Sequence, residues 1–157
     1  MRIPTEPRLG NQRAIDAFRN MTEIIFYTGV SAELPFLVKL SEKTIKMRRK
    51  ACIATRDIAH SKAVSKYLWT HDPTKFSPHS VDPEDLNDQL TALELRYDAT
   101  SSHLDILINL TEKKQSQFSS FHRLVEIITK NKGSIEMGRQ RFKWYRDRGY
   151  DIKVHKM

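Results

Sequence analysis

Hydrophobic residues recur at alternating spacings of four and three along residues 86–128, and this pattern constrains the fold more than any other feature. Ten of its thirteen positions are apolar or aromatic. An average spacing of 3.5 residues keeps such positions on one side of a helix that supercoils around a partner. The pattern predicts an oligomer seam made of Leu86, Leu90, Leu93, Leu104, Leu107, Phe118, Phe121, Val125 and Ile128.

Start and stop signals divide the chain into three expected helices. The first spans about residues 11–28, and the second begins near Pro35, which a first helical turn tolerates, and continues to about residue 69. The third runs from residue 83 to 130, and either breaks at Gly133 or continues until Gly149 stops it. We therefore expect an all-α protein, an elongated bundle of three to four long helices with coiled-coil-like packing.

The chain has 157 residues, which favours one domain. The expected single helical domain spans residues 1–157, with an irregular arm at 1–10, a linker at 72–82 between helices two and three, and a basic tail at 149–157. Cys52 lies between apolar neighbours, which indicates a small buried side chain and leaves no internal disulfide.

Charge is unevenly distributed along the chain, whose formal net charge is +8. A basic excess of this size commonly reflects an anionic partner such as nucleic acid, an acidic protein or a membrane surface. Residues 43–70 form one basic block, and residues 139–157 form another, whereas residues 81–110 are acidic. The first block can pair with the acidic segment along the helices, but the C-terminal block has no acidic counterpart.

The C-terminal block alternates cations with aromatic rings, as single-stranded nucleic acid binding requires. Basic side chains neutralise phosphates, while a flat ring can stack on an unpaired base. The candidate nucleic-acid-binding residues are Arg139, Arg141, Lys143, Trp144, Arg146, Arg148 and Lys153, and a weaker secondary patch comprises Lys46, Arg48, Arg49 and Lys50. A solvated helix end, or a helix lying on an anionic membrane, explains the same residues.

The ending Tyr145-Arg-Asp-Arg-Gly-Tyr-Asp-Ile-Lys resembles, over about ten residues, the C-terminal region of phage recombination mediators of the UvsY type. Those are small helical proteins that assemble into rings and bind single-stranded DNA. The resemblance implies a similar oligomeric, DNA-associated role.

Motifs for catalysis are not recognisable in the sequence. It contains no H-E-x-x-H pair, phosphate loop or nucleophile elbow, and the histidines at 71 and 79 with Asp72 make only a weak metal cluster. We therefore expect no enzyme activity, no metal, no cofactor and no small-molecule substrate. The start of the chain has no secretion signal and no segment is suited to spanning a bilayer, which indicates an intracellular protein of the cytoplasm, or of the nucleoid or nucleus.

These observations favour a non-enzymatic helical assembly protein that binds single-stranded DNA or RNA as a homo-oligomer through a basic face. Two alternatives fit the same sequence. One is a structural or adaptor subunit that docks on another protein through its helical seam. The other is a helical dimer that binds membrane surfaces.

Overall fold

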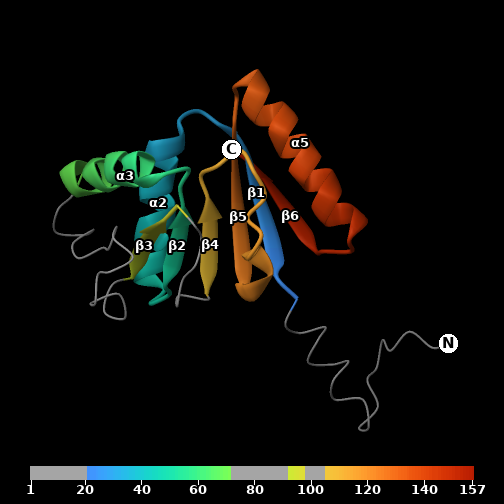
Figure 1. Cartoon of the computed structure of the whole chain (residues 1–157), viewed down its shortest axis with the longest axis horizontal. Helices are drawn as coiled ribbons and strands as arrows, with labels where there is room; N and C mark the ends of the chain where they lie inside the picture. Colours follow the sequence, from blue (N-terminus) through green and yellow to red (C-terminus); the bar gives the residue numbers. More distant parts are fainter. Residues whose placement is uncertain (1–20, 72–91, 98–104) are drawn as a thin grey trace, which may run out of the picture.

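The computed structural model describes residues 21–71, 92–97 and 105–157, and it shows an α/β fold (Figure 1). Six strands form one parallel sheet in the order β3-β2-β4-β5-β1-β6. The elements are β1 (Glu23–Val30), α2 (Glu33–Lys46), β2 (Ala51–Ala54), α3 (Ile58–His71), β3 (Leu93–Arg96), β4 (Ile106–Asn109), η2 (Phe118–Ser120), β5 (Arg123–Thr129), α5 (Lys132–Asp147) and β6 (Ile152–Lys156).

The direction in which the chain crosses the sheet decides which face each helix covers. The connections β1-α2-β2 and β2-α3-β3 move toward the β3 edge, whereas β5-α5-β6 moves toward the β6 edge. Because parallel crossovers are right-handed, opposite directions place the helices on opposite faces. α2 and α3 accordingly lie on one side of the sheet, and α5 lies on the other (Figure 1).

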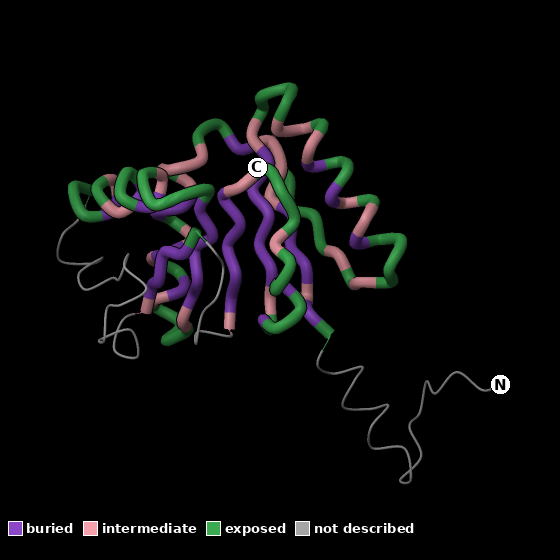
Figure 2. Tube along the Cα trace, in the orientation of Figure 1, coloured by how far each residue is buried: buried purple, intermediate pink, exposed green. Residues whose placement is uncertain are grey.

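Each face of the sheet therefore has its own core, and the central strands β2, β4 and β5 are buried for most of their length, whereas the edge strand β6 is largely exposed (Figure 2). Leu37 of α2 and Leu68 of α3 pack on one face against Ile53 and Ile108. Tyr145 of α5 belongs to the other core, with strand residues, Phe118 and Phe121. Strands covered on both faces have continuous apolar sequences instead of alternating ones.

The prediction of an all-α coiled-coil bundle is wrong, and the strand sequences explain the error. Leu93, Leu107 and Val125 lie in three different strands, and Phe118 and Phe121 lie in or beside η2. Short apolar strands, buried on both faces, supplied residues at spacings that mimic a heptad repeat. All the described members of the expected seam are at least 95% buried inside the chain's own core, so they offer no surface to an oligomer.

The expected second helix is likewise two helices and a strand. Four residues, Ala-Cys-Ile-Ala, form β2 between α2 and α3, and each is 0% exposed. Pro35 does lie in the first turn of α2, Cys52 is buried, and Gly149, with a φ of 80°, follows the last helix. These local predictions are confirmed.

Part of the sequence analysis concerns residues outside the described ranges. The arm at 1–10, the linker at 72–82, the third-helix residues Leu86, Leu90 and Leu104, and the weak cluster members Asp72 and His79 all fall there. Within the expected first helix, the described end is not helical, since β1 begins at Glu23. Residues 152–156 of the expected basic tail form β6.

Candidate functional site

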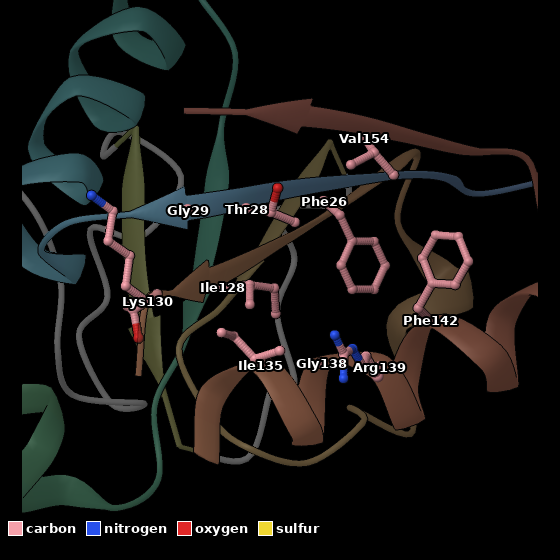
Figure 3. Close-up of a pocket in the computed structure, with 11 residues that line it drawn as sticks. Phe26, Thr28, Gly29, Ile128, Lys130, Ile135, Gly138, Arg139, Phe142 and Val154 are labelled. Carbon is pink, nitrogen blue, oxygen red and sulfur yellow. The ribbon is translucent and has the colours of Figure 1, made fainter. Parts of the chain in front are cut away.

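A pocket of about 380 Å³ opens between α5 and the sheet, close to the C-terminal ends of β1, β5 and β6. Figure 3 shows side chains from the helix and from all three strands around it. Its lining is mostly apolar and consists of Phe26, Thr28, Gly29, Ile128, Thr129, Lys130, Ile135, Gly138, Arg139, Phe142 and Val154.

The helix contributes one apolar stripe to this pocket. Ile135, Gly138 and Phe142 are spaced three and four residues apart, so they lie on the same side of α5. Gly138 is buried, and a Cβ atom there would come within 2.4 Å of Cδ1 of Ile128. The helix can approach β5 this closely only because position 138 carries no side chain. Phe26 and Phe142 then meet edge to face with their ring centroids 5.4 Å apart.

Two cations border the apolar pocket. Arg139 follows Gly138 on α5, Lys130 follows β5, and both side chains are exposed. None of the described residues that line the pocket is acidic. An apolar hollow with a positive border suits a ligand that has an apolar group flanked by negative charge.

A polar network lies under α5, beside the pocket. Glu126 on β5 is 0% exposed. Its carboxylate accepts hydrogen bonds from Asn109 Nδ2 at 3.0 Å and from the Tyr145 hydroxyl at 2.9 Å, and it lies 3.1 Å from Arg141 Nε. Burial raises the pKa of Glu126 to about 7 in spite of the neighbouring Arg141 guanidinium.

This network holds elements together. Arg141 also donates from Nη1 to the carbonyl oxygen of Glu112 at 2.7 Å, and Asn109 Nδ2 donates to the carbonyl oxygen of Lys113 at 2.9 Å. The network thereby joins β5, α5 and the segment after β4. The Glu126 carboxylate is fully enclosed by the protein, so it cannot contact a substrate. Its role is to position α5 against β5.

Six of the seven candidate nucleic-acid-binding residues lie on α5 or at its C-terminal cap, and Lys153 lies on β6. Arg139 borders the pocket, Arg141 is buried in the network, and Lys143 and Arg146 are exposed, with Arg146 3.5 Å from Asp147. Lys153 is on β6 and pairs with Glu23 at 2.9 Å, which lowers the pKa of Glu23. Arg139, Lys143 and Arg146 share one exposed side of α5, because they are spaced four and three residues apart, whereas Arg141 points into the core.

The ring of Trp144 already contacts two cations within the chain. Lys114 Nζ and Arg148 Cζ lie over its ring at 3.8 and 3.7 Å from the centroid. The ring also meets Phe118 edge to face. A base would have to displace a cation that the ring already attracts.

The secondary basic patch lies elsewhere, around the turn between α2 and β2. Lys46 ends α2, Arg48 has a φ of 55°, and Lys50 precedes β2. The backbone N–H of Lys50 donates to the Asp105 carboxylate at 3.1 Å. The patch, Arg49 included, therefore belongs to the N-terminal end of the parallel sheet, away from the pocket.

The sequence did not predict most of the pocket residues. Arg139 was predicted from its charge. Phe26 and Val154 are on strands that had been assigned to a helix and a tail. The apolar run Glu23–Val30, which ends in glycine and valine, was the available signal for a buried strand.

The described residues offer neither a metal site nor a membrane-spanning helix. No group of three or more His, Cys, Asp or Glu side chains is placed to hold a metal in residues 21–71, 92–97 and 105–157. Within the same residues, no helix has the length and apolar character required to cross a membrane.

Fold and pocket together define a class: a parallel α/β protein with an apolar surface pocket bordered by cations. Residues 21–153 match the family model of the DNA polymerase III chi subunit, HolC. The chain therefore belongs to this family. DNA polymerase III subunit chi of Pseudomonas aeruginosa is similar to it, with 28% identity over 141 residues, covering 87% of this chain and 98% of that protein.

A solved structure supports the fold alone. The crystal structure of T4 UvsW matches with a TM-score of 0.64 and 10% sequence identity, and covers 88% of this chain. The chain spans 42% of the length of that structure.

Family membership corrects the functional prediction. The chain is related to a polymerase subunit and is not a helical nucleic-acid-binding oligomer, and neither the fold nor the relatives support a homo-oligomer. The short resemblance to the UvsY-type mediators does not extend to the fold, since residues 152–153 of that ending lie in a strand of a parallel sheet.

Proposed function

We propose that this protein is a non-catalytic accessory subunit of DNA polymerase III that binds a protein partner, and that the pocket under α5 is one of its docking sites. The family match over residues 21–153 supports the polymerase role. As such a subunit it would act with the replication machinery at the nucleoid. No cofactor is needed for this role.

The observation that carries the docking proposal is the composition of the pocket. Apolar side chains form its wall and floor, while Arg139 and Lys130 are exposed at its border. A peptide segment with one large apolar residue among acidic residues satisfies both features. Burying an apolar side chain contributes about 1.5–3 kcal/mol, and charge complementarity adds specificity and speed of association.

A defined peptide set tests this proposal. The probes are fluorescein-labelled nine-residue peptides of alternating aspartate and threonine, with a single phenylalanine moved through each position in turn. Fluorescence anisotropy with the full chain should identify at least one register that binds. Its affinity should fall about tenfold or more with Arg139→Glu, because the charge at the border is reversed.

Arg146→Glu is the matched control, since Arg146 is also exposed on α5 but does not line the pocket. It should change the affinity less than about threefold. If no register binds, or if both variants weaken binding equally, the pocket is not a docking site of this kind. A separate measurement, co-elution of the full chain with the other purified subunits of DNA polymerase III, tests the subunit role.

A further inference from the structure

Strand β6 is an edge of the sheet immediately beside the pocket. In the part of the chain that the structure describes, β6 pairs with β1 alone. We propose that the docked partner segment is an extended acidic strand that pairs with the outer edge of β6, becoming a seventh strand, while its apolar side chain enters the pocket. This inference rests on the proposed docking function and specifies how the partner binds.

The register of β6 shows which backbone groups face outward. Ile24 N–H donates to the Asp151 carbonyl at 3.1 Å, and Met157 N–H donates to the Thr28 carbonyl at 2.9 Å. In a parallel ladder, alternate residues direct both their N–H and C=O toward the same neighbour. The N–H and C=O groups of the odd-numbered β6 residues therefore point toward β1. The outward N–H and C=O groups belong to Ile152, Val154 and Lys156.

The same three residues have their side chains on the pocket side of the sheet. Ile152 packs against the core under α5, and Val154 lines the pocket and is 46% exposed. Side chains alternate along a strand, so Lys156 lies on this face too. Figure 3 shows Val154 beside Phe26 at the pocket. A strand added to β6 would direct its alternate side chains toward the pocket and present its backbone to these open groups.

The positive charges near the outer edge of β6 favour an acidic partner. Lys153 and Lys156 are exposed on β6, and Arg139 and Lys130 border the pocket. Lysines on an edge strand discourage unspecific strand pairing. A second copy of the chain paired through β6 would bring its own Lys153 and Lys156 to the same edge, and like charges repel. An acidic segment would instead be attracted, which is why an acidic partner strand fits best.

Amide hydrogen exchange, followed by NMR on the full chain, tests the new ladder. Without peptide, the amides of Ile152, Val154 and Lys156 should exchange fast, and those of Lys153 and His155 slowly. The best-binding peptide of the aspartate–threonine set should slow alternate amides on β6, at least two of the three, by tenfold or more. Slow exchange of all three in the free protein would show an edge already covered by the chain and would overturn the inference.

Peptide N-methylation provides a test that leaves every protein side chain intact. Methyl groups at alternate residues of the peptide, in the frame that faces β6, should weaken binding tenfold or more, whereas the opposite frame should change it less than threefold. Equal tolerance of both frames, by a peptide that still depends on Arg139, would overturn strand addition while leaving the pocket as a docking site. A peptide-induced or spontaneous dimer through β6 in light scattering would overturn it in favour of a second copy.

Discussion

The Tyr145 hydroxyl donates a 2.9 Å hydrogen bond to Oε2 of Glu126, which joins helix α5 to strand β5 through the core. Arg141, one turn earlier on the same helix, lies 3.1 Å from the same carboxylate oxygen. The face of α5 next to the pocket is thus attached by apolar packing, and the adjoining face by a buried polar network. The first predictions concern this network.

Stability should depend on pH through Glu126. Its pKa is about 7 in the folded protein and close to the ordinary glutamate value of 4.5 when the chain is unfolded. Between these values the folded state retains a proton that the unfolded state has released, so stability falls as pH rises. Relative to Glu126→Gln, the natural protein should lose about 2–3 kcal/mol between pH 5 and pH 8.

Urea unfolding of both proteins at the two pH values measures this difference, and the histidines they share cancel in the comparison. The opposite sign, with the natural protein gaining stability relative to the variant as pH rises, would show that the ion pair with Arg141 dominates burial.

Arg141→Met should destabilise the protein by about 3–5 kcal/mol at pH 8, because a buried carboxylate loses its ion-pair partner. The loss should be smaller at pH 5, where Glu126 is mostly protonated, and smaller again in the double variant with Glu126→Gln. Lys143→Met is the control, since Lys143 is exposed on the same helix, and it should stay within about 0.5 kcal/mol. An identical loss of stability at both pH values would show that the effect of Arg141 does not depend on the charge of Glu126.

Gly138→Ala should be destabilising, although alanine favours helix. The new Cβ would lie 2.4 Å from Cδ1 of Ile128, and overpacking of this kind costs about 1–3 kcal/mol. Ile128→Val removes that Cδ1 atom, so the double variant should recover most of the loss. Thermal unfolding of the two single variants and the double variant measures the coupling. Additive effects would mean that the helix shifts to avoid the contact.

Gly149→Ala should cost about 1–2 kcal/mol through the backbone alone. Gly149 has a φ of 80°, and an added Cβ would meet no atom within 4 Å. Gly149→Asn should cost less, because asparagine tolerates positive φ better than alanine does. Denaturant unfolding of the two variants tests the order. If alanine is no worse than asparagine, the turn can adopt another conformation.

Local signals in this sequence predicted local structure well. Pro35 marked the first turn of a helix, Gly149 marked the end of another, and the apolar neighbours of Cys52 predicted its burial. Each of these depends on a few adjacent residues and on the steric preference of a single one.

The sheet could not be found in the same way, because pairing joins distant residues. Ile24 lies between Leu124 and Ile152 in the sheet, and four-residue strands such as β2 have no period of their own. Arg139 was predicted as a site residue from its charge. Phe26 and Val154 could become site residues only once β1 and β6 were placed side by side.

The position of β1 also affects how the protein folds during synthesis. Its two neighbours, β5 and β6, follow it by about 100 and 130 residues along the chain. Such distant pairing is slow to form. The apolar segment that forms β1 therefore remains unpaired on both edges until the residues of β5 and β6 have left the ribosome. This makes it a natural target for a chaperone.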